Sequence, residues 1–196
     1  VVGSYKQALG SEDGTNNGGS PTNFADGFRQ INWDPAPTVP FSDDKGAAFP
    51  GDFMNQATNP RARGALFTTA AGGSFRLSAN DDSGAPVLFG TANEFSVFSA
   101  QRLFAVEGGS VFDITFRDPT NPTQPALTDG FGSVFTGVEV AGETKIEYFD
   151  ILGAKIHELA VPVSGSGLSF AGATFDDHVV ARVTVTAGNL AISKCG

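Results

Sequence analysis

Cysteine, histidine and the polar aromatic residues are scarce in this chain. Its 196 residues include one Cys, two His, one Trp and two Tyr. The single thiol, Cys195, cannot form a disulfide within the chain, and a metal site built from cysteines is excluded. We expect an exposed thiol near the end of the chain, with pairing to a second chain as the alternative.

Positive charge is also scarce, since 12 Lys and Arg stand against 21 Asp and Glu and the formal net charge is −9. An acidic surface repels phosphate groups, so we expect neither a nucleic-acid partner nor attraction to an anionic membrane. Ca²⁺ is the kind of partner that such a surface suits.

Long apolar runs are absent as well. No stretch approaches the about 20 apolar residues that span a bilayer, and we therefore expect no insertion into a membrane. The sequence also lacks a charged start followed by an apolar stretch. If the protein is secreted, we expect that its signal peptide has already been removed.

Phenylalanine, glycine and proline are abundant, with 18 Phe, 25 Gly and 11 Pro. Phenylalanine suits a dry core and is favoured in strands, whereas glycine and proline favour turns. Apolar residues form 40% of the chain and charged residues 17%, which is typical of a globular protein. The length predicts one domain, residues 1–196, built from many short strands.

Apolar and polar residues alternate in several segments, which is the pattern of half-buried β-strands. Turn-rich segments separate these strands about every 10 residues from residue 132 onward. We therefore predict an all-β fold, an antiparallel β-sandwich or jelly roll, with its main strands in residues 66–196. The residues expected on inward faces are Phe75, Leu77, Phe112, Ile114, Phe116, Ile146, Tyr148, Ala181, Val183 and Val185.

Three segments depart from the alternating pattern. Residues 1–65 carry isolated apolar residues among Gly, Asn, Asp and Pro, and predict a loop-rich N-terminal segment that wraps over the sandwich. Residues 118–130 contain three prolines and predict a long surface loop. Residues 93–106 predict a strand with a short helical turn near Ser99–Leu103.

The stretch EDGTNNGG, residues 12–19, is rich in oxygen ligands. Its spacing follows the first half of a calcium-binding loop of the form D-x-[DN]-x-[DN]-G, with a hydroxyl at the third position. Phe24 stands where such a loop needs a bidentate Glu, so other carboxylates would have to contribute. The alternative is a solvated, glycine-rich turn without an ion. The candidate calcium ligands are Glu12, Asp13, Thr15, Asn17, Asp26 and Asp34.

Trp33 is the only tryptophan and is a candidate stacking platform for a sugar ring. Arg29 is the second candidate ligand-binding residue. In the alternative interpretation, Trp33 covers one end of the core with its N–H bonded to a loop carbonyl. Arg29 and Asp34 would then form an ion pair at the surface.

No GxSxG, HExxH or phosphate-binding glycine motif is present. Hydrolysis of a polysaccharide would need two acids in one cleft, and Glu139, Glu147 and Glu158 fall on successive predicted strands. Strict alternation places His157 and Glu158 on opposite faces, with Lys155 on the His157 face, which disfavours a His–Glu acid–base pair.

Seven phrases, in this order, cover most of the chain. They are GFRQINWD (27–34), FPGDFMN (49–55), RGALFTT (63–69), FSAQRLFAVEGGSVFDITF (98–116), GFGSVFTGVEV (130–140), IEYFDILGAKI (146–156) and LSFAGATFDDHVVARVTVTAGN (168–189). They resemble a largely uncharacterised group of secreted bacterial proteins, many of which carry a PEP-CTERM sorting tail. The resemblance implies an exported all-β domain at the cell surface or in the extracellular matrix, and it implies no reaction. The chain itself shows no Pro-Glu-Pro sorting motif, so anchoring by such a tail is not implied.

We therefore expect an extracellular, non-catalytic binding module that is stabilised by calcium and binds a glycan or acts in adhesion. The first alternative is a structural subunit of an extracellular filament or surface layer, in which the partners are neighbouring subunits. The second alternative is an enzyme that acts on a polysaccharide.

Overall fold

The computed structural model describes residues 1–9, 15–34, 39–41, 45–91, 93–99 and 101–188. The described chain is mostly β, with one short α-helix, α1 (Val2–Ala8), and two single-turn 3₁₀ segments, Asp81–Ser83 and Leu88–Gly90. The prediction of an all-β antiparallel sandwich is confirmed. In the described residues no helix is long and apolar enough to cross a membrane.

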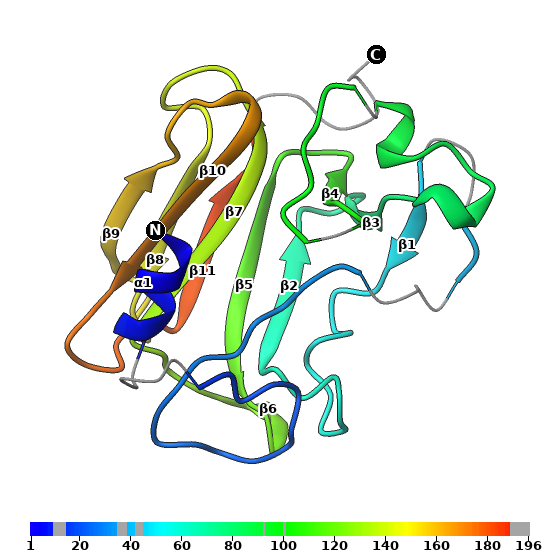
Figure 1. The fold of residues 1–196 in the computed structure, drawn as a ribbon. Coiled ribbons are helices and arrows are strands. Elements are labelled where there is room, and N and C mark those ends of the chain that lie inside the picture. Colours follow the sequence, from blue (N-terminus) through cyan, green and yellow to red (C-terminus); the bar gives the residue numbers. More distant parts are fainter. Residues whose placement is uncertain (10–14, 35–38, 42–44, 92, 100, 189–196) are drawn as a thin grey trace.

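One large antiparallel sheet forms the back of the molecule in Figure 1. Its strands, in spatial order, are β2 (Ala65–Thr69), β5 (Val111–Asp118), β11 (Arg182–Thr186), β8 (Lys145–Phe149) and β9 (Lys155–Ala160), and β6 (Asn121–Pro125) pairs with the end of β5.

Two smaller sheets pack against the apolar face of this large sheet. The first is the β7–β10 pair, formed by β7 (Gly130–Val138) and β10 (Gly165–Thr174), which lies over β8 and β11 in Figure 1. The second is a three-stranded sheet in the order β1 (Ala47–Phe49), β3 (Ser74–Leu77) and β4 (Phe104–Glu107). The second layer of the sandwich is therefore split into two parts.

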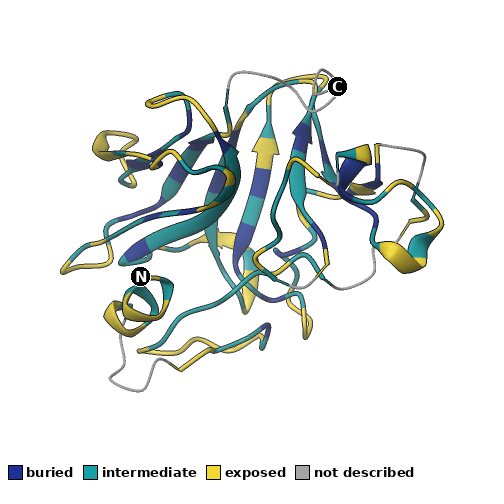
Figure 2. Cartoon of the chain, turned by 45° about the horizontal axis from the view of Figure 1, so that its top comes forward, coloured by how far each residue is buried: buried dark blue, intermediate teal, exposed yellow. Residues whose placement is uncertain are grey.

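The core lies between these layers, as the alternating pattern predicts. Phe112 and Ile114 of β5 are buried, and so are the residues that lie beside them on β11, Val185 and Val183. Figure 2 shows that buried residues are concentrated in the strands, while exposed residues lie mainly in the connecting loops. The inward faces predicted for these strands are thus confirmed.

The N-terminal segment is loop-rich, as expected, but it begins with a helix that the sequence did not predict. Tyr5 of α1 packs against glycines of the β7–β10 pair, where a Cβ at Gly132 or Gly172 would lie 2.9 or 3.0 Å from the Tyr5 ring. The Tyr5 hydroxyl donates a hydrogen bond to the Ala173 carbonyl at 3.0 Å. Burial of the phenol raises the pKa of Tyr5.

Two other segments differ from expectation. The proline-rich segment 118–130 was expected to be a loop, but it contains β6, which is compatible with Pro122 and Pro125 because β6 lies at the edge of a sheet. Residues 95–97 were expected to begin a strand but have no regular structure, and β4 begins only at Phe104. Here the Ser96 N–H donates to the Thr136 hydroxyl, outside any strand pairing.

Candidate binding groove

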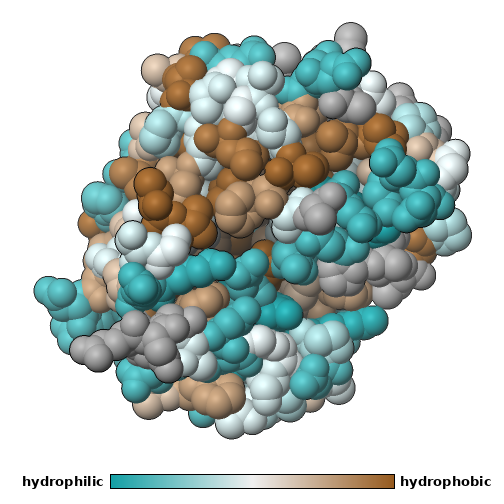
Figure 3. All heavy atoms as spheres, in the orientation of Figure 1, coloured by the Kyte–Doolittle hydropathy of each residue, from teal (hydrophilic) through white to brown (hydrophobic). Residues whose placement is uncertain are grey.

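A groove with a volume of about 710 Å³ runs between the β7–β10 pair and the N-terminal segment. Its floor is the apolar face of the large sheet, to which Phe67, Ile114 and Phe116 contribute. In Figure 3, hydrophobic side chains form a band across this face of the molecule, with a hollow near its centre. The split in the second layer thus leaves a cavity over the core.

The walls of the groove are formed by three continuous stretches of chain. Residues 126–136, which include most of β7, line one side. Residues 23–33 of the N-terminal segment and residues 102–106, which run into β4, line the other. Strands at the ends of both small sheets therefore border the same groove.

Apolar side chains continue from the floor onto the rim of the groove. Phe24 is 50% exposed, Phe98 53%, Leu127 41% and Leu168 40%, and all four line the groove. Large exposed apolar side chains that gather around a cavity are typical of sites that bind an apolar ligand or another protein.

The groove is also basic in an otherwise acidic chain. Five of the 11 Lys and Arg residues that the structure describes line it, compared with only two of the 17 described Asp and Glu residues. The basic lining residues are Lys6, Arg29, Arg63, Arg102 and Arg117, and the acidic ones are Asp26 and Asp129.

Arg29 fixes the N-terminal wall through hydrogen bonds to main-chain carbonyls. Burial lowers the pKa of Arg29, and the nearby charge of Arg63 lowers it further. Its guanidinium is nevertheless well satisfied, because it donates to four carbonyl oxygens. These belong to Gly18 at 2.9 Å, Ser20 at 3.0 Å, Thr22 at 2.6 Å and Ala62 at 2.8 Å.

The predicted surface ion pair of Arg29 with Asp34 is not what the structure shows. Arg29 instead binds the carbonyls just described, and the Asp34 carboxylate accepts a hydrogen bond from the Gln101 N–H at 3.2 Å. Carbonyls of a curved loop offer several acceptors close together, which a planar guanidinium can satisfy at once. Arg29 therefore has a structural role in the wall.

Lys6 and Arg63 meet at Gln30 on the same wall. The Lys6 ammonium donates to the Gln30 side-chain oxygen at 2.5 Å, and Arg63 Nη1 donates to the Gln30 carbonyl at 2.5 Å. Burial lowers the pKa of Arg63. Its Nε and that of Arg117 are buried and make no hydrogen bond to the described atoms. The groove thus carries positive charge and two buried N–H groups that have no partner among the described residues.

Trp33 lines the groove but is mainly part of an aromatic cluster. Its ring is stacked on Phe104 with centroids 4.3 Å apart, and it makes edge contacts with Phe49 at 5.4 Å and Phe67 at 5.9 Å. This placement favours the alternative in which Trp33 covers the core. A role for Trp33 in sugar binding stays a prediction.

The candidate calcium loop is described only in part. Glu12 and Asp13 lie outside the described residues. The Asn17 side-chain amide donates to the Asp26 carbonyl at 2.7 Å, and the Thr15 carbonyl accepts from the Phe28 N–H at 3.0 Å. Among the residues that can be assessed, no three His, Cys, Asp or Glu side chains gather at one point. Calcium binding here stays a prediction.

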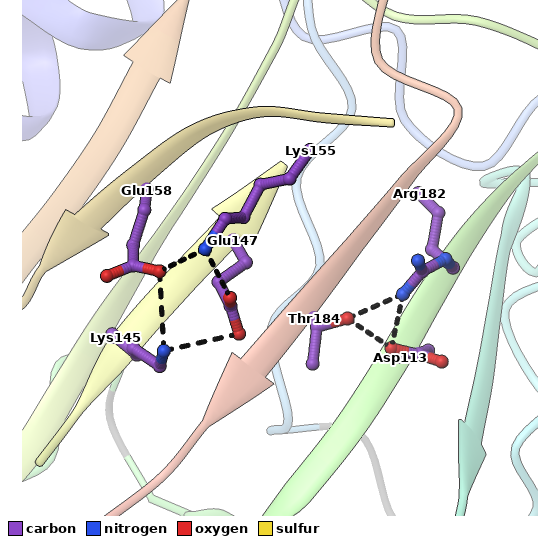
Figure 4. Close-up of polar contacts among 7 residues, drawn as sticks. All are labelled: Asp113, Lys145, Glu147, Lys155, Glu158, Arg182 and Thr184. Carbon is purple, nitrogen blue, oxygen red and sulfur yellow. Dashed lines mark hydrogen bonds and ion pairs between the residues drawn. The ribbon is translucent and has the colours of Figure 1, made fainter. Parts of the chain in front are cut away.

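Two of the candidate catalytic acids, Glu147 and Glu158, lie together on the outer face of the large sheet (Figure 4). Lys155 contacts Glu147 at 3.1 Å and Glu158 at 2.7 Å, and Lys145 contacts the same two acids at 3.4 and 3.3 Å. Hydrogen bonds from Lys155 and Lys145 lower the pKa of Glu158 to about 2. The third acid, Glu139, is exposed just beyond β7.

The prediction that Lys155 lies on the His157 face of β9 is wrong. A bulge between Tyr148 and Phe149 shifts the register, so Lys155 lies on the Glu158 face. His157 lies on the opposite side, where its ring contacts Tyr148 at 5.7 Å and Phe175 at 6.1 Å. His157 and Glu158 are therefore on opposite faces, as predicted.

Sequence reasoning did not identify the groove itself. The sequence does contain one indication of the groove, which is the composition of β7. This strand reads GFGSVFTGV and has no charged residue and no proline over its length. Comparison of the chain with protein-family models, with curated proteins and with solved structures found no match. Proposals about function therefore depend on the geometry of the groove.

Proposed function

We propose that the protein is an extracellular, non-catalytic binding module and that the groove is its binding site. The volume of the groove, about 710 Å³, lies within the range of about 300–1,000 Å³ that is common for ligand sites. Its aromatic and aliphatic lining favours an elongated apolar ligand over a sugar. The extracellular location is supported by the resemblance of the sequence to exported proteins.

The observation that carries this proposal is the exposed apolar rim. Phe24 and Phe98 are each about half exposed at the edge of a cavity whose floor is apolar. Burying such side chains contributes about 25 cal/mol for each Å² removed from water, so an apolar ligand gains free energy on entering. In contrast, Glu147 and Glu158 are both bound by lysines away from the groove and give no support to polysaccharide hydrolysis.

Titration with the fluorescent probe 1-anilinonaphthalene-8-sulfonate tests the proposal, because the probe is both apolar and anionic. We expect saturable binding to the wild-type protein and binding weakened severalfold in Phe98→Ser and Phe24→Ser. Leu152→Ser is the matched control, since Leu152 is 89% exposed and does not line the groove. Equal affinity in all four proteins would rule out the groove as the binding site.

Calcium is proposed as a stabilising ion at residues 12–19, where the oxygen-rich spacing supports it. A ligand that binds only the folded state raises the melting temperature. We expect Ca²⁺ to raise the melting temperature, a chelator to reverse the rise, and Asp13→Asn to remove it. An unchanged melting temperature would show that this loop holds no structural ion.

A further inference from the structure

We infer that the groove holds an extended strand from a second copy of this chain, which pairs with the free edge of β7 and completes the second layer of the sandwich. The inference depends on the proposed function, in that it takes the groove as the binding site. It adds the identity of the partner and the mode of binding, which is β-strand addition.

One edge of β7 lacks a partner strand among the described residues. In the described part of the chain, β7 pairs only with β10, and residues 130–136 line the groove. Figure 1 shows β10 on one side of β7 only. Side chains of the described residues already bond to the Gly130 N–H and to the carbonyls of Gly130, Phe131 and Val134. No described strand pairs with the groove side of β7, so its other main-chain groups on that side are available to another strand.

The edges of β6, β9 and β2 are protected, whereas the β7 edge carries none of the features that protect them. β6 carries Pro122 and Pro125, and β9 has a bulge and the charged pair Lys155 and Glu158. The β2 edge is covered, because the Phe67 N–H donates to the Gly51 carbonyl at 2.9 Å. Natural proteins use such features to prevent edge-to-edge pairing, and β7 has no charge, no proline and nine residues.

The groove has the shape of a slot for one more strand, with a strand on each side and an apolar floor. β4 is the last strand of the three-stranded sheet, and it borders the groove opposite β7. The floor offers Phe67, Ile114 and Phe116, against which alternate side chains of an added strand would pack. An added strand would thus bury its apolar side chains on the floor and also form hydrogen bonds with the main chain of β7.

The distribution of charge selects a second copy as the partner. Among the described residues, five basic and two acidic residues line the groove, whereas six basic and 15 acidic residues lie elsewhere. A basic groove and an acidic remainder are complementary between two copies. The occupied surface and the occupying strand are different parts of the chain, so the contact is head-to-tail and can continue from copy to copy.

The experiment measures molecular mass against protein concentration by light scattering. We expect mass to rise above the 20.2 kDa of one chain as concentration increases, and to fall as salt screens the basic groove. Val134→Glu places a charge on the edge of β7 and should weaken association about tenfold or more, because docking would bury an unpaired carboxylate. Val134→Thr, which keeps β-branching without charge, should associate as the wild type does.

Two further measurements keep the test decisive if Val134→Glu fails to fold. Lys6→Glu, on the opposite wall, should also weaken association, while Thr123→Glu on the exposed strand β6 should leave it unchanged. Amide hydrogen exchange in residues 130–136 should slow as the mass rises.

Two outcomes would overturn the inference. One is a monomer at every concentration, and continued binding of the fluorescent probe by that monomer would leave the proposed binding groove standing. The other is association of equal strength in Val134→Glu and Lys6→Glu, which would place the contact on another surface.

Discussion

The two small sheets are attached to the same large sheet in different ways. The three-stranded sheet is held by aromatic rings. Phe75 of β3 contacts Phe67 of β2 at 6.0 Å and Phe112 of β5 at 5.9 Å, and Phe104 of β4 contacts the same two rings at 5.5 and 5.7 Å. Such contacts depend on close packing of large apolar rings and include few polar groups.

The β7–β10 pair is held in part by buried tyrosine hydroxyls. Tyr148 of β8 is fully buried, and its hydroxyl donates to the Phe131 carbonyl at 2.8 Å and accepts from the Ala173 N–H at 3.1 Å. Tyr5 reaches the Ala173 carbonyl from the other face. The hydroxyl of Tyr148 thus links the large sheet to both strands of the pair.

Each part of the second layer is therefore anchored on its own. Neither set of contacts needs the two small sheets to meet, because each uses the large sheet as its base. A space between them can therefore remain open without cost to either, and the groove lies in that space.

Phe75→Ala should remove about 3–5 kcal/mol from the free energy of unfolding, because it leaves a cavity among rings that are nearly completely buried. Unfolding in urea, followed by fluorescence of Trp33, measures this loss on the aromatic side. Phe75→Leu is the control and should cost much less, since it retains most of the volume. A loss below about 1 kcal/mol for Phe75→Ala would mean that the cluster does not anchor this sheet.

Tyr148→Phe should cost about 1–3 kcal/mol, because it removes the hydroxyl that satisfies the Phe131 carbonyl and the Ala173 N–H. Hydrogen exchange should rise at Ala173 more than in the three-stranded sheet. If both small sheets loosened equally, the idea of independent anchoring would be wrong.

Alkaline pH should lower the free energy of unfolding, mainly through the tyrosines that hold the β7–β10 pair. Burial raises the pKa of both Tyr5 and Tyr148 above the value of 10.0 expected for a free phenol. The neutral form is favoured in the folded state, so stability is constant below about pH 10 and falls as the unfolded state ionises above it. Melting curves between pH 8 and 12 should show this decline, and Tyr148→Phe should make it less steep.

Acid pH should have the smallest effect on the free energy of unfolding, and this effect should arise in the three-stranded sheet. A hydrogen bond from Arg76 lowers the pKa of Glu107, which lies beside it at 2.5 Å. Its contribution is present above pH 4.5 and is lost as pH falls through the lowered pKa. Because the pair is partly exposed, Glu107→Gln should cost less than about 1 kcal/mol at pH 7 and flatten the acid decline. If stability fell with acid as steeply in Glu107→Gln as in the wild type, the decline would have to come from other carboxylates.

The alternation of β5, β8 and β11 could be predicted from the sequence because these strands have one buried and one solvated face. The β6 strand could not, since prolines usually indicate a loop and only the neighbouring strand shows that they lie at an edge. The face of β9 on which Lys155 lies could not be predicted either, because it depends on a bulge of one residue that the pattern of apolar and polar residues does not reveal.

The groove was beyond sequence reasoning because it depends on which strands pair over long distances. Residues 23–33 and 126–136 line it together, although nearly a hundred positions separate them in the chain. Helix α1 was missed for a similar reason, since its seven residues are held by Tyr5 against distant glycines. Local propensity carries no information about either arrangement.

The four carbonyl contacts of Arg29 bear on how quickly the groove can be occupied. They tie Arg29, a residue of the N-terminal wall, to residues 18–22 and to Ala62, which holds that wall in place. The strand that we propose as the occupant would then lose little entropy to the ordering of a loop, and its arrival would not wait for a slow rearrangement. Arrival rates should therefore vary little among variants, and differences in affinity should come from how long the occupant stays.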